Sequence, residues 1–512
     1  MSGEQGERRR RTGDPRGRSQ GRRDPASGRR GASGGEGQQR GPQRTVQPAR
    51  RVAYDVLRAV SESEAYANLI LPPAIAEAGL NPQDAALATE LAYGTLRRRG
   101  TYDAIISAAA DRPADEIDPA VLDALRLATH QLLATRVASH AAVNESVNLV
   151  AMAQGRGASS FANAVLRRIT RETPEEWEKR IEDSARSDDE RLALRSAHPV
   201  WVIRALRRAL AAEGRADELD DLLDADNASP EVTLVALPGL AEPREPRRPY
   251  APTAYGSPGG DPHRVIAASG GTVRVQDEGS QLVALALAGA APIAEGERWL
   301  DLCAGPGGKT ALLAAVAGPH HVTLEANEVV PTRARLVRNA LRAVPGEIVV
   351  HEEDGRTFGA SHSGMFDRIL VDAPCTGLGA LRRRPEARWR KSPADVAELV
   401  PLQVELLSSA LDALAPGGIV AYATCSPHLA ETTGVVQEVL RGRTDITELD
   451  ARAVVARVAD SPIDLADDGS GRVQLWPHRH GTDAMFLALL QRDTTDTLAA
   501  SDKRSARADE GE

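Results

Sequence analysis

Residues 298–310, "RWLDLCAGPGGKT", decide the fold of the C-terminal half of this chain. A short apolar run ends in Asp301 and Cys303, and a glycine-rich loop follows before the sequence becomes helical again. Glycine allows the backbone to approach a ligand closely, and the N–H groups at the start of the next helix attract negative charge. The stretch predicts a buried strand, a ligand-binding loop and a helix.

The same alternation continues through residues 276–492, where Val-, Ile- and Leu-rich runs alternate with helical patterns. Such alternation is typical of an α/β domain with a doubly wound, mainly parallel sheet. Ligands bind such sheets at the carboxyl ends of the strands. The loop does not match the dinucleotide pattern GxGxxG, and it fails the P-loop pattern because Cys303 stands where a glycine is needed.

All three cysteines of the chain follow predicted strands: Cys303, Cys375 in "VDAPCTG" and Cys425 in "YATCSPH". A thiol at a strand end, ahead of a helix, can have a lowered pKa and act as a nucleophile. The alternative is a buried cysteine that acts as a small hydrophobic residue. No CxxC pair supports a redox site, and His320–His321 and His478/His480 lack partners at metal-ligand spacing, so we expect no metal.

Acidic residues stand at the same strand ends. Glu325 and Asp354 follow the next two predicted strands, where carboxylates can accept hydrogen bonds from a nucleoside cofactor. Asp372 lies three residues before Cys375, and a carboxyl group there can hydrogen-bond the edge of a cytosine. Each acid alone can equally be a solvated side chain.

The whole chain of 512 residues has a net charge of −9, but residues 1–51 carry +9 and leave −18 for the rest. We expect a disordered basic arm over 1–48, an all-helical domain over 49–185, a connector over 186–275, the α/β domain over 276–492 and a disordered tail over 493–512. The arm either attracts nucleic acid or only solubilises the chain. The absence of a signal segment and of any long apolar run predicts a cytoplasmic protein with no membrane contact.

A basic segment, "LRRRPEARWRK" at 381–391, directly follows the Cys375 turn. Positive charges suit phosphates and an indole suits base stacking, so the segment predicts contacts with single-stranded RNA. The alternative is a solvated charged loop. The predicted RNA-contact residues are Arg382, Arg383, Arg384, Arg388, Trp389 and Arg390.

The motifs "DLCAGPGGKT", "DAPCTGLGALRRRPEARW" and "YATCSPHLAE" resemble, in order and spacing, those of the Sun/Fmu family of RNA cytosine-C5 methyltransferases. Residues 49–170, including "FANAVLRR", resemble the NusB-like RNA-binding domain fused to the family's ribosomal small-subunit methyltransferases of type B. The resemblance implies a Rossmann-like class I methyltransferase domain, S-adenosylmethionine as cofactor and RNA, most of all 16S ribosomal RNA, as partner.

Carried over by position, the resemblance makes Cys425 the nucleophile that attacks C6 of a cytidine, and Cys375 the thiol that helps release product. Asp372 lies between cofactor and base. DNA cytosine methyltransferases instead place the nucleophile in the "PC" motif, so the assignment of the two thiols rests on the family. The implied cofactor contacts are Cys303, Ala304, Gly305, Pro306, Gly307, Gly308, Lys309, Glu325, Asp354 and Asp372.

The family pattern is not matched everywhere. The loop reads AGPGG where AAPGG is commoner, and "TDAMFLALL" replaces the usual Asp-Gly-Phe near the end. Two other functions are weighed against the main prediction: a tRNA cytosine-C5 methyltransferase, and a non-catalytic RNA-binding or antitermination protein. We expect a monomer.

Overall fold

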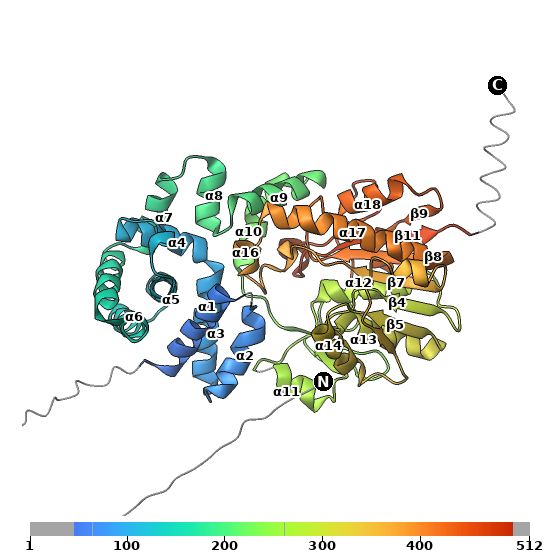
Figure 1. Ribbon diagram of the computed structural model, residues 1–512, viewed down its shortest axis with the longest axis horizontal. Coiled ribbons are helices and arrows are strands. Elements are labelled where there is room, and N and C mark those ends of the chain that lie inside the picture. The colour runs from blue at the N-terminus through green and yellow to red at the C-terminus, as the bar shows by residue number, and fades with distance from the viewer. Residues whose placement is uncertain (1–45, 64, 261, 495–512) are drawn as a thin grey trace, which may run out of the picture. The chain divides into compact units, whose positions relative to one another are not determined.

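The computed structural model describes residues 46–63, 65–260 and 262–494 (Figure 1). The predicted basic arm lies outside the described residues up to position 45, and the predicted C-terminal tail lies outside them from position 495.

The first part of the described chain is helical, as predicted. Capping side chains fix the N-termini of several helices. Asn81 and Asp118 each accept backbone N–H bonds as N-cap residues ahead of a proline, and Thr173 forms a capping box with Glu176. Alanine and leucine fill a single core between the helices. The helices are α1 Pro48–Glu62, α2 Ala67–Glu77, α3 Pro82–Arg97, α4 Arg99–Ala110, α5 Pro119–Ala134, α6 Ser139–Ile169, α7 Pro174–Asp183 and α8 Asp188–Ser196.

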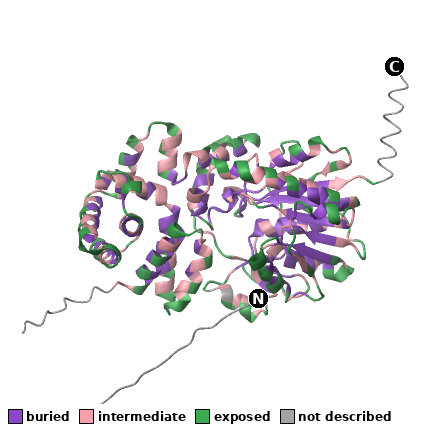
Figure 2. Ribbon diagram, viewed as in Figure 1, coloured by how far each residue is buried: buried purple, intermediate pink, exposed green. Residues whose placement is uncertain are grey.

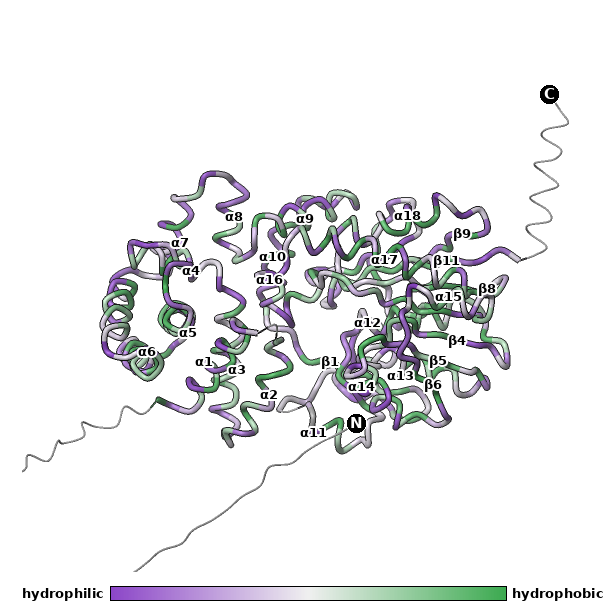
Figure 3. Tube along the Cα trace, viewed as in Figure 1, coloured by the Kyte–Doolittle hydropathy of each residue, from purple (hydrophilic) through white to green (hydrophobic). Residues whose placement is uncertain are grey.

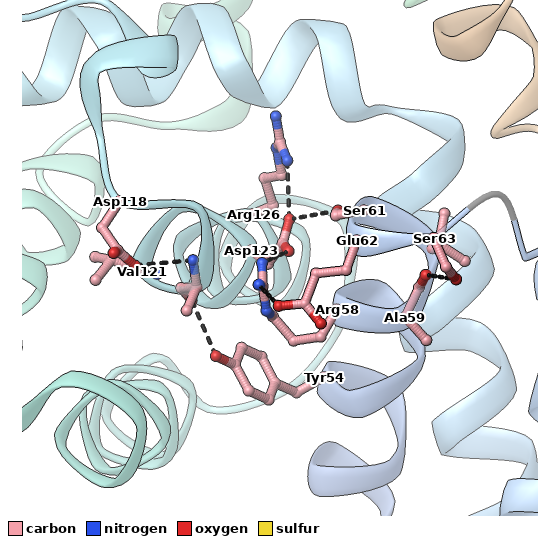
Figure 4. Close-up of polar contacts among 12 residues, drawn as sticks. Tyr54, Arg58, Ala59, Ser61, Glu62, Ser63, Asp118, Val121, Asp123 and Arg126 are labelled. Atoms are coloured by element: carbon pink, nitrogen blue, oxygen red, sulfur yellow. Dashed lines mark hydrogen bonds and ion pairs between the residues drawn. The ribbon is translucent and has the colours of Figure 1, made fainter.

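A buried carboxylate joins helices α1 and α5 (Figure 4). Asp123 is 2% exposed and accepts hydrogen bonds from Arg58 at 2.7 Å, Arg126 at 2.8 Å and Ser61 at 3.2 Å. Arg126 also forms a bidentate pair with Asp103 of α4, at 2.6 and 2.7 Å. The network fixes three helices to one another because each buried charge has an opposite charge beside it.

The connector combines three α-helices with a small antiparallel sheet in the order β2-β1-β3. The sheet's buried residues Val235 and Ala254 pack in the same core as helix α12 (Glu278–Gly289), which begins the second half of the molecule. The connector elements are α9 Val200–Ala212, α10 Leu219–Asn227, β1 Thr233–Ala236, β2 Ala254–Gly256, α11 Pro262–Ala268 and β3 Val273–Val275.

Within the described residues, the C-terminal half is built on an eight-stranded sheet in the order β10-β11-β8-β7-β4-β5-β6, with β9 beside β11. Strands β4 to β8 pair in parallel and β11 runs antiparallel to β8, so the prediction of a mainly parallel sheet is confirmed. The strands are β4 Arg298–Asp301, β5 Thr323–Asn327, β6 Val349–His351, β7 Phe366–Asp372, β8 Leu414–Thr424, β9 Ile446–Leu449, β10 Val473–Gln474 and β11 Phe486–Arg492.

Helices cover both faces of this sheet, which makes it doubly wound. One core contains residues of α12, α13 (Gly308–Ala317), α14 (Pro331–Leu341) and α19 (Ala451–Val458). The other contains residues of α17 (Pro393–Ala413) and α18 (Thr433–Arg441). The central strands β4, β7, β8 and β11 are mostly buried and hydrophobic (Figures 2 and 3), as expected for a parallel sheet covered on both sides.

The pairing of β7 with β8 decides where the site lies. Their parallel register places Asp372 opposite Ala423, so the turns that follow the two strands leave the sheet side by side. Strand β4 is the next neighbour of β7, and the glycine-rich loop leaves the sheet at the same edge. Three segments far apart in sequence therefore converge at the carboxyl ends of adjacent strands.

We predict that Asp123→Ala destabilises the helical domain by about 3 kcal/mol, because Arg58 and the buried Arg126 each lose one of their two carboxylate partners and the bond between α1 and α5 is broken. Urea denaturation followed by circular dichroism measures the change. Asp55→Ala is the matched control: its side chain is 50% exposed and its pair with Arg51 lies on the surface, so we expect a loss within about 0.5 kcal/mol. Equal losses in the two variants would contradict the network's role.

Candidate active site at the carboxyl ends of the strands

Two cysteines meet where β7 and β8 end. Cys375 lies three residues beyond β7 and Cys425 directly follows β8, and their sulfur atoms are 3.5 Å apart. A backbone hydrogen bond also joins the two turns: Gly379 N–H donates to the Cys425 carbonyl at 2.9 Å. The two thiols that the sequence placed at separate strand ends therefore belong to one site. Cys303 follows β4 but packs against the hydrophobic core beside α17.

The two thiols have opposite electrostatic environments. A hydrogen bond from Cys375 lowers the pKa of Cys425 despite its burial, and the positive charge of Arg384 acts in the same direction. The same hydrogen bond, together with burial, holds the pKa of Cys375 well above its usual value. Cys425 is therefore the group that ionises first, with the Cys375 S–H as its donor.

An ion pair stands beside the thiols. Lys309 Nζ, in the first turn of α13, lies 2.7 Å from the Asp372 carboxylate at the end of β7. Burial lowers the pKa of Lys309, but Asp372 more than offsets this effect, so the pKa is raised and the ammonium keeps its charge. Lys309 was predicted as part of the cofactor loop; the structure brings it to Asp372 and close enough to Cys425 to interact electrostatically with it.

The glycine-rich loop is shaped by its neighbours. Gly307 has φ +97°, and a Cβ there would lie 2.7 Å from the Cβ of Ala340 in α14, so only glycine fits. Asp301 ends β4 and accepts a hydrogen bond from Thr310 at 2.7 Å, which fixes the start of α13 against the strand. Burial raises the pKa of Asp301 to about 7.

Two buried acceptors beside this loop have no hydrogen-bond partner among the described residues. They are Oδ1 of Asp301 and Oε1 of Gln276, which faces Gly308. Buried polar atoms are normally paired, so orphaned acceptors indicate a missing donor. An ammonium group supplies such donors, and the amino-acid part of S-adenosylmethionine carries one. The residues at this loop therefore fit the predicted cofactor.

The acid that faces the loop is not Glu325, and the sequence prediction is corrected here. Glu325 lies in the middle of β5, where Arg298 and His351 each donate to its carboxylate at 2.8 Å. Glu328, just beyond the end of the strand, accepts the N–H of Gly305 at 3.1 Å and is 4% exposed. Sequence reasoning missed Glu328, although its place at the strand end, before Pro331 at the start of α14, was the signal.

Asp354 lies in the loop after β6, as predicted, with its carboxylate 41% exposed. Arg356 donates to it through both the backbone N–H and the guanidinium, and these bonds lower its pKa. The carboxylate is held in one orientation and still faces solvent. Its contact with the adenine of a cofactor remains a prediction.

Most side chains of the predicted RNA-contact segment form hydrogen bonds with other parts of the protein. Arg388 is 0% exposed and donates to the carbonyls of Ala197 and Asp226 and to Asn227, in the connector region. Trp389 donates to the Leu96 carbonyl at 3.1 Å, and a Cβ on Gly100 would lie 2.2 Å from its ring. Arg388 thus joins the sheet-containing half to the connector, and Trp389 joins it to the helical domain.

The other members of the segment behave similarly. Arg382 is 8% exposed and donates to the Gly481 carbonyl, and Arg383 is paired with buried Asp483. Arg390 donates to three carbonyls at the end of α1 and beyond it. The RNA-contact prediction is therefore corrected for the buried Arg382 and Arg388, and it stays a prediction for Arg383, whose side chain is 40% exposed, and for the half-buried Trp389 and Arg390. Arg384, exposed and over the ring of Tyr66, remains a candidate.

Within residues 46–63, 65–260 and 262–494, no group of three or more His, Cys, Asp or Glu side chains is arranged to bind a metal ion. None of the helices in the same ranges is long and apolar enough to cross a membrane.

The geometry can be compared with known proteins. Residues 290–491 match the family of the 16S rRNA methyltransferase RsmB/F, and residues 47–171 match the NusB family. A ribosomal RNA small subunit methyltransferase B of Pseudomonas syringae is 31% identical over 475 residues, which cover 89% of this chain and 98% of that protein. The chain belongs to the RsmB/F family. It is thus an RNA methyltransferase with a NusB-like helical domain, and the predicted resemblance is confirmed.

Other relatives agree with this assignment. A Mycobacterium tuberculosis protein, whose name gives methyl transfer but no substrate, is 48% identical over 468 residues, or 89% of this chain and 99% of that protein. The crystal structure of the protein PH0851 has the same fold, with a TM-score of 0.73 at 22% identity over 88% of this chain and 99% of that one. The RsmB/F fold thus extends over both halves of the molecule.

We predict that iodoacetamide alkylates Cys425 of this RsmB/F protein at a lower pH than a free thiol, because its pKa is lowered. Cys375→Ala removes the S–H donor, so the pKa rises and the pH profile moves to higher pH. Cys375→Ser keeps a donor and should stay near wild type. The measurement is the alkylation rate between about pH 6 and 10 in a Cys303→Ser background. Identical profiles for the alanine and serine variants would contradict the assigned hydrogen bond.

We also predict that Arg388→Ala destabilises the protein by about 3 kcal/mol, because three buried acceptors lose their donor and a cavity remains. Thermal and urea unfolding measure the change. Arg441→Ala is the control, since that side chain is 72% exposed in a surface pair with Glu438 and is expected to change stability by less than about 0.5 kcal/mol. A wild-type stability for Arg388→Ala would restore the segment as an RNA-contact candidate.

Proposed function

We propose that this protein methylates C5 of a cytidine in 16S ribosomal RNA, with S-adenosylmethionine as methyl donor and Cys425 as covalent nucleophile. The observation that carries the proposal is the contact of 3.5 Å between the Cys425 and Cys375 sulfurs, beside the Lys309–Asp372 pair. The ribosomal target is supported by the family and by the NusB-like domain.

The cofactor would be held at the loop from Cys303 to Lys309. In this proposal the unpartnered Oδ1 of Asp301 and Oε1 of Gln276 accept from its ammonium, and the carboxylate of Glu328, which already accepts the Gly305 N–H of the loop, accepts from its ribose hydroxyls. Asp354 is the candidate for the adenine. When bound, S-adenosylmethionine supplies an electrophilic methyl group on its sulfonium.

The first task of the protein residues is to make C5 nucleophilic. The Cys425 thiolate attacks C6 of the cytosine, so that a sulfur–C6 bond forms and the electron pair of the C5–C6 double bond moves into the ring towards N3. Asp372, paired with the ammonium of Lys309, accepts a hydrogen bond from the base. The Lys309 charge stabilises the negative charge as it develops.

The second task is to release the product. After the methyl group has joined C5, a base removes the C5 proton, its electron pair restores the C5–C6 double bond and the C6–sulfur bond breaks to return the thiolate. Cys375 touches the departing sulfur and can donate a hydrogen bond to it. The base must leave its stack to reach the site, which costs least in a loop or single strand.

We predict that Cys425→Ala abolishes methyl transfer, while Cys375→Ala forms a covalent RNA–protein adduct that persists. Tritiated S-adenosylmethionine and a denaturing gel measure the two outcomes on ribosomal RNA from cells that lack the gene. Arg441→Ala, at a side chain that is 72% exposed, is the control and should keep most activity. Methylation by Cys425→Ala at the wild-type rate would overturn the nucleophile.

The target is tested separately. Bisulfite sequencing of ribosomal RNA and tRNA from cells with and without the gene should reveal one 16S cytidine that loses its modification. Loss of a tRNA modification instead would favour a tRNA methyltransferase, and no change in either RNA would favour a non-catalytic RNA-binding role.

A further inference from the structure

A second carboxylate lies behind the two thiols, on the side away from solvent. Glu431 stands between β8 and α18, and it is 0% exposed. Its backbone is fixed as well, because Tyr422 of β8 donates its hydroxyl to the Glu431 carbonyl at 2.8 Å. A group with no exposed surface cannot touch RNA, so its function must act through its neighbours.

The neighbours are the residues that follow the two cysteines. Thr376 donates to the Glu431 carboxylate twice, from its N–H at 2.8 Å and from its hydroxyl at 2.5 Å. Ser426 donates its hydroxyl at 2.7 Å. The hydroxyls of Thr376 and Ser426 are themselves 3.2 Å apart. One carboxylate therefore joins the residue after Cys375 to the residue after Cys425.

The turn of Cys375 is held from its other side too. Gln403 of α17 donates to the Glu431 carboxylate at 3.2 Å and to the Pro374 carbonyl at 2.9 Å. Pro374 and Thr376, the two chain neighbours of Cys375, are thus both connected to Glu431. The Cys375 sulfur is left to face Cys425.

Burial of a carboxylate is costly unless several donors converge on it. Here the four donors named above are neutral, and each comes from a segment that carries or supports a thiol. A carboxylate is the side chain that accepts in every direction, whereas the amide of glutamine would point an N–H group at one of these donors. The cluster is thus built around an acceptor-only group.

We infer that Glu431 is a positioning residue that sets the distance between the Cys425 and Cys375 sulfurs. The inference rests on the function proposed above and extends it by a residue that neither binds cofactor nor touches the base. Adduct formation needs the Cys425 thiolate to be held towards the pyrimidine, and release needs Cys375 to stay next to that sulfur. Glu431 controls both conditions because it restrains both turns.

The test compares Glu431→Gln with Glu438→Gln, a glutamate of α18 that is 54% exposed. For Glu431→Gln we expect kcat for RNA methylation to fall at least 30-fold, with KM for RNA and for S-adenosylmethionine within threefold of wild type. Glu438→Gln should match wild type. Thr376→Val and Ser426→Ala each remove one donor and should give intermediate losses, which keeps the test usable if Glu431→Gln folds poorly.

A second readout does not depend on methylation. Diamide takes two electrons and two protons from a pair of thiols, so that a disulfide forms and the reagent is reduced to its hydrazine. In the reference protein, which carries only Cys303→Ser, Cys375 and Cys425 should form a disulfide rapidly because their sulfurs are in contact. In Glu431→Gln the rate should fall at least tenfold, although iodoacetamide still modifies both thiols.

The outcomes separate the two proposals. If disulfide formation is slower in Glu431→Gln but the wild-type protein methylates no RNA, the positioning role stands and the proposed function is overturned. Wild-type rates for both disulfide formation and methylation in Glu431→Gln would overturn the positioning role alone. A raised KM with an unchanged kcat would also overturn it, because it would place Glu431 in binding.

Discussion

The site depends on the parallel pairing of β7 with β8. Parallel neighbours end at the same edge of a sheet, and the register that sets Asp372 opposite Ala423 brings the Cys375 and Cys425 turns together. A shift by one residue would turn the side chains of one strand to the other face of the sheet. The β8 register is held on its other side by six residue pairs with β11. Strand β11, which runs antiparallel to β8, thus helps to fix the strand that Cys425 follows.

Local patterns were enough to predict much of this arrangement. Apolar runs that end in turn residues predict strand ends, and strand ends in a parallel sheet share an edge, so the placement of Cys375, Cys425 and Asp372 followed from the sequence. Glu325 was the error in that reasoning. It lies inside β5, three positions before Glu328, whereas Glu328 lies just beyond the end of the strand and accepts the Gly305 N–H of the glycine-rich loop.

The RNA-contact prediction for the basic segment after Cys375 was wrong at its buried arginines for a different reason. Composition shows that a run of arginines exists, but not whether each guanidinium meets water, phosphate or a carbonyl. The partners of Arg388, Trp389 and Arg390 lie about 160 to 330 residues earlier in the chain, in segments that gave no sign of free acceptors. Glu431 was missed similarly, because its donors come from three separate turns and helices. Contacts of this range are visible only once the chain is folded.

The segment that joins the two halves also begins a few residues beyond Cys375. Arg390 is anchored on the carbonyls around the end of α1, while Gly379, upstream on the same segment, is bonded to Cys425. The two regions that match different families are therefore joined by direct side-chain contacts. A chain trimmed to its sheet-containing half would leave the Trp389 indole and the Arg390 guanidinium without these partners, on the segment whose Gly379 is bonded to Cys425.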